Sequence, residues 1–180
     1  MECTPIYYDP QLYIETNNGN RISKLSSIRG IQNIVPAGKV IIKPGAILRG
    51  DLSRIKIGQC TTIETEAILR PAYSKSKGKL KYNEMTIGDF VFIGARSIVV
   101  ASKIGNCVEI GEDCVIGQRA TIKDNCILLP NSIVPPEGVI PPFTVYGGRP
   151  AVFIAELPES TEEVHKHKAI CRYVRFKRQA

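Results

Sequence analysis

The sequence predicts an all-β chain that winds into a single-stranded β-helix, a three-sided prism of stacked coils, and ends in an α-helix. The main observation is a period of six: from residue 104 an aliphatic side chain recurs at every sixth position, and a smaller residue stands four places after each. Helices repeat every 3.6 residues and strands every two, so this period indicates a solenoid of hexapeptide repeats. The aliphatic positions are Ile104, Ile110, Ile116, Ile122, Leu128, Val134 and Ile140.

Three hexads form one triangular coil, so residues 18 apart are expected to stack in adjacent coils. Ile104 should then lie against Ile122, and Ile122 against Ile140, at a strand spacing of about 4.8 Å. The repeats extend over about five coils, a prism about 25 Å tall at that spacing. Glycines follow many inward aliphatic residues, at corners that favour a residue without Cβ. These are Gly58, Gly88, Gly94, Gly105, Gly111 and Gly117.

The pattern divides the chain into three regions. Residues 1–27 are a leader expected to pack on the first coil, and residues 28–157 are the β-helix, with an excursion at 70–86. Pro135-Pro136 and Pro141-Pro142 lack amide donors, which suits a last coil that no further coil joins. Residues 158–180 are expected to form a basic helix, opened by a capping box at residues 160–163. This helix either folds back on the prism or docks on a partner.

Composition excludes several classes of protein. No run of about 18 apolar residues could span a bilayer, and the first residues lack the pattern of a secretory signal, so a cytosolic location is expected. The six cysteines contain no C-x-x-C pair, and Cys114 and Cys126 occupy small inward positions, so they are expected to fill the core. Neither disulfides nor a zinc site are predicted.

The net charge of +7 has two sources, a lysine-rich loop at 75–81 and a basic run at 166–178. A basic balance can indicate nucleic acid or an acidic protein surface as a partner. No recognition motif and no stripe of aromatic and basic residues accompanies these charges, so solvated charge is predicted rather than RNA binding.

Two enzyme classes use hexapeptide-repeat prisms, the γ-class carbonic anhydrases and acyltransferases. The chain resembles the anhydrases at residues 47–51, 57–58 and 87–88, but their three metal-ligand positions fall on Arg70, Ala95 and Val100, which do not bind a zinc-like ion. The acyltransferases use a histidine as general base. Here only His165 and His167 exist, both on the basic helix, where they are expected to be exposed. No catalytic, cofactor-binding or metal-binding residue is predicted.

Arg49-Gly50-Asp51 has the sequence of an adhesion tripeptide. In a prism it is more simply explained as a corner insertion in which Arg49 and Asp51 form charge-assisted hydrogen bonds.

Segments outside the regular hexads indicate a family more specifically than the repeat does. These are residues 13–16, 32–35, 48–52, 69–71, 139–146 and 156–159. They resemble the β-helical pointed-end subunits of dynactin, over residues 12–165. The resemblance implies a left-handed β-helix, whereas periodicity alone does not fix the hand. It also implies a non-catalytic scaffold that is cytoplasmic and cytoskeleton-associated and supports dynein–dynactin attachment to cargo such as endosomes.

The same resemblance implies particular partners. These are the β-helical dynactin subunit 6 as heterodimer partner, dynactin subunit 4, the pointed-end actin-related protein and dynein cargo adaptors, with neither nucleic acid nor membrane insertion. From exposure and charge, the candidate contact residues are Lys75, Lys77, Lys79, Lys81, Arg149 and Arg172. The alternative from another class is an enzyme like a γ-carbonic anhydrase or an acyltransferase with relocated catalytic residues, and a third is an RNA-binding module.

Overall fold

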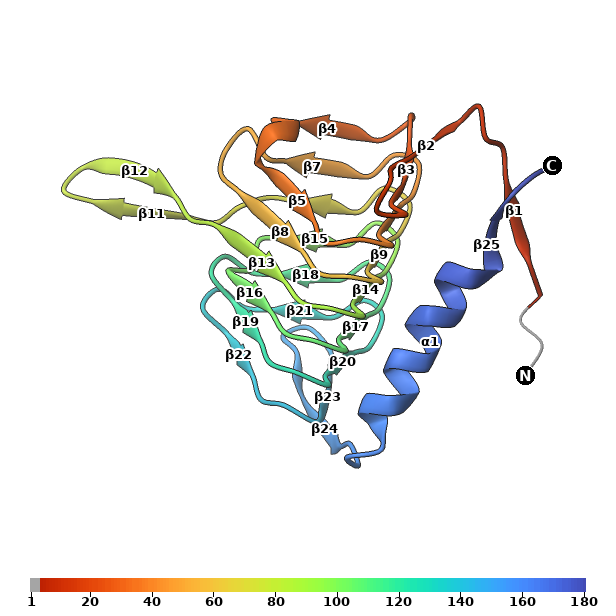
Figure 1. Ribbon diagram of the computed structural model, residues 1–180. Helices are drawn as coiled ribbons and strands as arrows, with labels where there is room; N and C mark the ends of the chain where they lie inside the picture. Colours follow the sequence, from red (N-terminus) through yellow and green to blue (C-terminus); the bar gives the residue numbers. More distant parts are fainter. Residues whose placement is uncertain (1–3) are drawn as a thin grey trace.

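The computed structural model describes residues 4–180 and confirms the predicted fold (Figure 1). The chain forms a left-handed β-helix of about six turns, with one long helix lying along the outside of the prism. The sixth turn lies at the N-terminal end, where β3 (Arg21–Ser23) and β4 (Ser27–Arg29) pair in parallel with strands of the next coil. Coil pairing therefore begins seven residues before residue 28, in a stretch without a regular hexad.

Three sheets form the faces of the prism. The helix-covered face has nine strands, of which β2 and β24 are antiparallel end strands. In spatial order its strands are β2 (Tyr13–Glu15), β3, β6 (Ile41–Ile42), β9 (Thr62–Ile63), β14 (Phe92–Ile93), β17 (Glu109–Ile110), β20 (Ile127–Leu128), β23 (Thr144–Gly147) and β24 (Val152–Glu156).

The other two faces each contain six parallel strands. One consists of β4, β7 (Ile47–Arg49), β10 (Ile68–Leu69), β15 (Ile98–Val99), β18 (Val115–Ile116) and β21 (Ile133–Val134). The other consists of β5 (Ile34–Pro36), β8 (Ile55–Ile57), β13 (Met85–Ile87), β16 (Lys103–Ile104), β19 (Thr121–Ile122) and β22 (Val139–Ile140), and a short 3-10 helix (Ile31–Asn33) precedes β5.

The predicted columns of stacked side chains are confirmed. Ile104 pairs with Ile122, and Ile122 with Ile140, in adjacent coils. These inward residues are almost completely buried and belong to one continuous core. Because each buried methylene contributes about 0.8 kcal/mol, the repeated isoleucines supply much of the stability of the prism. Cys114 and Cys126 lie in this core as predicted, whereas Cys3 lies outside the described residues.

The corner glycines are required by the close approach of adjacent coils. A Cβ on Gly58 would lie 2.3 Å from the backbone of Gly88, and one on Gly111 would lie 2.5 Å from the nitrogen of Pro130. Neither glycine needs a positive φ, so the constraint at these corners is space between coils and not backbone conformation.

Two insertions leave the prism at corners. At the first, Arg49 donates from Nε and Nη2 to the two carboxylate oxygens of Asp51, at 2.8 and 2.9 Å, which confirms the structural reading of this tripeptide. The second is not an irregular loop: β11 (Tyr73–Ser76) and β12 (Lys79–Tyr82) form an antiparallel hairpin that projects away from the prism (Figure 1).

The first and last described strands meet beside the helix-covered face. The chain leaves β24, forms α1 (Thr161–Arg175), and ends in β25 (Phe176–Arg178), which pairs in parallel with β1 (Ile6–Tyr8). Tyr8, Tyr13 and Phe176 pack their rings together at this junction. The predicted capping box is wrong: Ser160 has helical backbone angles and its side chain makes no capping hydrogen bond.

Candidate protein-interaction surfaces

The helix α1 folds back on the prism, which decides between the two predicted alternatives. Thr161, His165 and Ala169 are buried on its prism-facing side. His165 Nδ1 lies 2.6 Å from the carbonyl oxygen of Cys107 and only 4% of the residue is exposed. The expectation of two exposed histidines is therefore wrong for His165 and holds for His167. A buried imidazole with this contact is a poor candidate for a general base.

A single carboxylate, Glu109 of β17, binds the middle of α1. Lys168 Nζ lies 3.5 Å from one oxygen of Glu109, and Arg172 Nη2 lies 3.4 Å from the other. The Arg172 guanidinium also stacks 4.0 Å above the ring of Phe92. Burial lowers the pKa of Arg172 from its usual range, which the nearby carboxylates partly oppose. Arg172, predicted as a contact residue, is thus engaged within the chain.

A partly buried arginine holds the C-terminal end of α1. Arg21 of β3 donates to the carbonyl oxygen of Tyr173 at 2.8 Å and also to that of Phe176. Its guanidinium lies 4.1 Å from the centre of the Tyr173 ring. The last carbonyls of a helix carry partial negative charge, so a cation at this position is stabilising. The helix is therefore fixed at both ends and in the middle.

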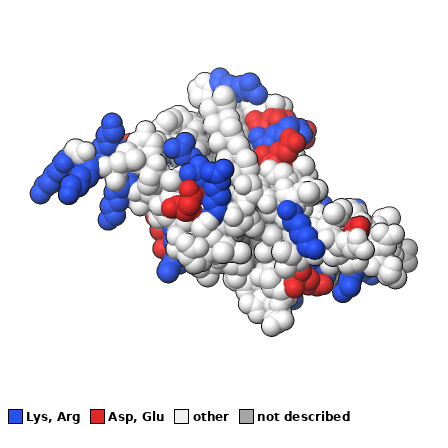
Figure 2. Space-filling view, turned by 90° about the horizontal axis from the view of Figure 1, so that it is seen from above, with Lys and Arg blue, Asp and Glu red and all other residues white. Residues whose placement is uncertain are grey.

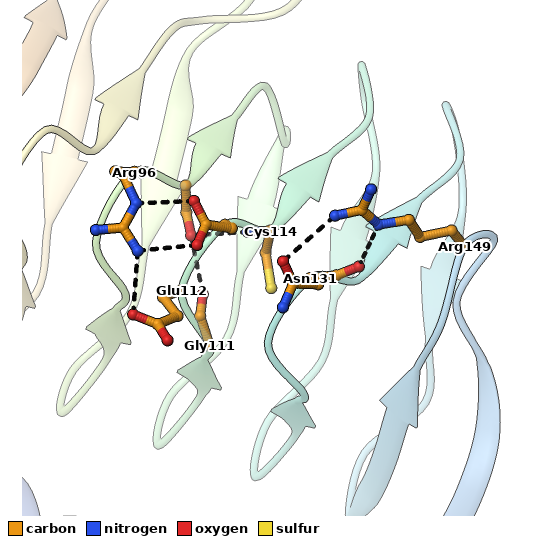
Figure 3. Close-up of polar contacts among 8 residues, drawn as sticks. Arg96, Gly111, Glu112, Cys114, Asn131 and Arg149 are labelled. Atoms are coloured by element: carbon orange, nitrogen blue, oxygen red, sulfur yellow. Dashed lines mark hydrogen bonds and ion pairs between the residues drawn. The ribbon is translucent and has the colours of Figure 1, made fainter.

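A column of polar residues follows one corner of the prism (Figure 3). Arg96 donates from Nε and Nη2 to the carboxylate of Asp113 at 2.9 Å and from Nη2 to Glu112 at 3.2 Å. The hydrogen bonds from Arg96 lower the pKa of Asp113. Further along the corner, Arg149 donates to the carbonyl oxygen of Asn131 at 2.8 Å while remaining exposed. Arg149 thus joins adjacent coils and still presents its charge to solvent.

The hairpin of β11 and β12 carries the other four predicted contact residues. Lys75, Lys77, Lys79 and Lys81 are all exposed, and within residues 4–180 none of their side chains forms an ion pair or hydrogen bond. The structure thus places the lysines together on one protrusion, remote from Arg172 on the helix-covered face (Figure 1). Arg149 lies on a third site, near the C-terminal end of the prism.

An exposed apolar surface lies beside β24. All five residues of this end strand are exposed, including Val152, Phe153 and Ile154. Next to it a groove of about 450 Å³ is lined by apolar residues, among them Phe92 and Ile127, and by three glutamates. Sequence reasoning did not identify this surface, because residues 152–154 follow the last hexad and carry no period.

The described part of the chain contains no group of three or more His, Cys, Asp and Glu side chains arranged to hold a metal ion. Nor does it contain a helix long and apolar enough to cross a membrane. The described residues form three sheet faces, a basic hairpin and an exposed apolar end strand, which are features through which proteins contact one another.

Comparison with known proteins identifies the family. The sequence matches the family described as Dynactin subunit 5 over residues 1–179. It is also 52% identical over 176 residues to a protein named Dynactin subunit 5 from Dictyostelium discoideum, covering 98% of this chain and 89% of that protein. This chain belongs to the dynactin subunit 5 family.

Solved structures similar to this family member share its fold. A hexapeptide transferase family protein from Anaplasma phagocytophilum has a TM-score of 0.66 and 22% identity, covering 86% of this chain and 89% of its own. A perosamine N-acetyltransferase from Caulobacter crescentus has a TM-score of 0.61 and 16% identity, covering 76% of this chain and 57% of its own. At these identities the likeness concerns the β-helix alone and carries no information on activity.

The contacts that sequence reasoning missed join distant parts of the dynactin subunit 5 chain. Arg21 binds residues about 150 positions away, and Glu109 binds Arg172 across 63 positions. Neither Arg21 nor Glu109 stands in a motif, so only the folded structure brings their partners together. For the hairpin a signal existed: tyrosines stand on either side of a central Lys77-Gly78, and glycine at such a position is typical of a tight hairpin turn.

Proposed function

We propose that this chain is a non-catalytic scaffold subunit of dynactin, located in the pointed-end complex and supporting dynein–dynactin attachment to cargo such as endosomes. The observation that carries the proposal is family membership across the whole chain, with 52% identity to a named dynactin subunit 5. In this role the protein is cytoplasmic and cytoskeleton-associated. Its proposed partners are dynactin subunit 6, dynactin subunit 4, the pointed-end actin-related protein and dynein cargo adaptors.

The architecture supports a scaffold role on physical grounds. Parallel coils joined by backbone hydrogen bonds form flat, stiff faces, and rigid surfaces bind partners at a low entropic cost. The apolar surface at Val152, Phe153 and Ile154 is an end strand whose outer edge no other described strand covers. Soluble proteins usually protect such edges, so an apolar and exposed one is typical of a contact surface.

The histidine geometry supports a non-catalytic role. Hexapeptide-repeat acyltransferases share the fold, but His165 is buried against Cys107 and His167 is on the outer side of α1. The positions carried over from the γ-carbonic anhydrases, Arg70, Ala95 and Val100, offer no imidazole, thiolate or carboxylate.

Affinity capture from the source cells tests the proposal. The tagged chain should co-purify stoichiometrically with an actin-related filament and with a second β-helical protein, which mass spectrometry and negative-stain electron microscopy would detect. Recovery of the chain only as a homotrimer would contradict the pointed-end assignment.

The proposal that the chain is non-catalytic has a separate test. The purified chain should contain no stoichiometric metal by elemental analysis and should not transfer acetyl groups from acetyl coenzyme A. A bound metal at one equivalent, or turnover that His165→Asn abolishes, would overturn it. An RNA-binding function predicts salt-dependent affinity for nucleic acid, which the same preparation should lack at low salt.

A further inference from the structure

The hairpin of β11 and β12 is a preformed protrusion with a fixed base. Gln118 donates from its side-chain amide to the carbonyl oxygen of Tyr73 at 2.5 Å, and the Asn83 amide donates to Ala72 at 2.7 Å. The rings of Tyr73 and Tyr82 pack edge to face across the two strands. From this base each four-residue strand extends about 14 Å, at about 3.4 Å per residue. These contacts fix the base of the hairpin, and its tip points away from the prism (Figure 1).

The tip of the hairpin holds a lysine where its backbone prefers another residue. Lys77 and Gly78 are the two loop residues, with φ of 47° and 75°. Two positive φ values define the tight turn in which Asn, Asp or Gly is favoured at the first position. Twelve other described residues that are not glycine share a positive φ, so the backbone of Lys77 defines the turn and places this lysine at the tip, and it is not in itself a sign of function.

The four lysines surround the protrusion. Paired residues of an antiparallel ladder share a face, so Lys75 lies with Leu80 on one face, and Lys79 and Lys81 lie with Ser76 and Ser74 on the other. Lys77 stands at the tip. In Figure 2 the projecting end at the left is covered mainly by basic atoms. The positive charge therefore encircles the hairpin.

We infer that this hairpin is a docking element that inserts into a carboxylate-lined cleft of a protein partner. The inference deepens the proposed function, on which it depends only for the identity of the assembly that supplies the partner. The four lysines lack internal partners among the described residues, so their charge is available for an intermolecular contact. The half-exposed Leu80 adds one apolar contact to the side that carries Lys75.

The arrangement favours a protein cleft over a membrane or a nucleic acid. A bilayer surface would contact one face and leave the cations on the opposite face unused. The hairpin contains no arginine, the residue that binds phosphate with two parallel hydrogen bonds. Its two tyrosine rings pack on each other and are therefore not presented for stacking on bases. An acidic cleft would contact both faces and the tip at once.

Binding of defined probes to the purified full-length chain tests the inference. The hairpin variant K75S/K77S/K79S/K81S is compared with a matched control, K24S/K103S/K123S/K177S, which removes four exposed lysines elsewhere. Both variants lower the net charge from +7 by four. The probes are a fluorescent deca-glutamate peptide, vesicles of phosphatidylcholine and phosphatidylserine, and a uridine oligonucleotide. Circular dichroism verifies that both variants are folded, which is expected because no hairpin residue is buried.

At low salt the hairpin variant should lose affinity for the glutamate peptide by about tenfold or more, and the control should change much less. Equal losses in the two variants would show that net charge alone is responsible and would overturn the inference. Vesicles or oligonucleotide bound more tightly than the peptide, through the same lysines, would also overturn it.

A second experiment uses the purified assembly. A carbodiimide couples lysine amines to carboxylates in direct contact, so hairpin lysines should be joined to Asp or Glu of another chain more often than the four control lysines are. Coupling of hairpin lysines only within this chain would contradict a docking role. This outcome is independent of the proposed function, because capture of the filament would succeed even if the hairpin made no contact.

Discussion

The helix α1 and the hairpin of β11 and β12 each carry four Lys or Arg residues, yet they use them in opposite ways. Every cation of α1 has a partner within the chain: Lys166 binds Glu162, Lys168 and Arg172 bind Glu109, and Arg175 donates to the carbonyl oxygen of Thr4. Within residues 4–180 the hairpin lysines have none. Two stretches with the same number of cations thus differ completely in what those cations contact.

The difference shows that a basic sequence is not in itself a binding surface. On α1 the cations serve the internal contact that holds the helix to the prism, with Glu109 as the shared partner. On the hairpin, lysines alternate with Ser74, Ser76, Gly78 and Leu80, along two strands that pair with no other described strand. Charge that has an internal partner contributes to stability, and charge without one is available to another molecule. Stability measurements should therefore separate the two regions.

The largest loss of stability is expected at the contact between Arg21 and the C-terminal end of α1. Arg21→Ala removes two charge-assisted hydrogen bonds and a cation–π contact, and should lower the free energy of unfolding by about 3 kcal/mol. Urea unfolding followed by circular dichroism measures this. Arg29→Ala, an exposed arginine on the neighbouring strand β4, is the matched control and should change stability by less than about 0.5 kcal/mol. Equal losses in both variants would contradict the role assigned to Arg21.

The contact between α1 and the prism also predicts sensitivity to alkali. Burial raises the pKa of Cys107 from 9.0 to about 11, so the folded protein holds this proton more tightly than the unfolded chain does. The associated stability is complete below about pH 9 and is lost as the pH rises to about 11, an effect of about 2 kcal/mol. Unfolding curves between pH 8 and pH 11 measure it. Cys107→Ala should flatten the decline, and parallel curves for the two proteins would refute this explanation.

The two histidines of α1 provide an internal comparison. His165→Ala leaves the buried carbonyl of Cys107 without its partner and should cost about 2 kcal/mol. His167→Ala, two residues further along the same helix, removes an exposed ring and should cost less than about 0.5 kcal/mol. Thermal unfolding of both variants measures the two stability losses and allows them to be compared. A similar loss in the two would mean that helix propensity, and not the buried contact, sets the effect.

A substitution at Glu109 tests whether this one carboxylate accounts for the stabilising effect of the α1 cations. Glu109→Gln keeps the shape of the side chain and removes the charge shared by Lys168 and Arg172, so stability should fall by about 1 kcal/mol. Because screening weakens ion pairs, the difference from the native chain should shrink at high salt. Glu112→Gln removes the exposed partner of Arg96 and serves as the control. A loss that is independent of salt would indicate a packing effect instead.

The comparison also shows what the sequence could reveal. The hexad period predicted the stacking of Ile104, Ile122 and Ile140 because each coil repeats the geometry of the one before it. The partners of Arg172 could not be predicted, since Glu109 lies in the second half of the prism and belongs to no motif. The capping box at Ser160 failed because the preceding turn already gives this residue helical backbone angles. A sequence therefore predicts geometry that repeats along the chain, but it does not predict a single contact between distant residues.

The candidate contact residues follow the same rule. Exposure of the lysines at 75–81 could be inferred from their position in an excursion, but their arrangement on two faces required the strand register. Arg172 also lies in a basic run, yet its guanidinium pairs with Glu109 and stacks on Phe92 within the chain. The apolar end strand at Val152, Phe153 and Ile154 escaped notice because exposed apolar residues have no signature apart from the fold.

The smallest effect on stability is expected in the hairpin itself. Because its lysines have no partner among the described residues and no hairpin residue is buried, K75S/K77S/K79S/K81S should leave the free energy of unfolding within about 0.5 kcal/mol of the native value. The corresponding helix variant, K166S/K168S/R172S/R175S, removes the same number of charges and should destabilise by several times as much. Parallel urea titrations of the two compare them directly. If the hairpin variant were the less stable of the two, its lysines would have to hold the fold together, and they could not also be free to bind a partner.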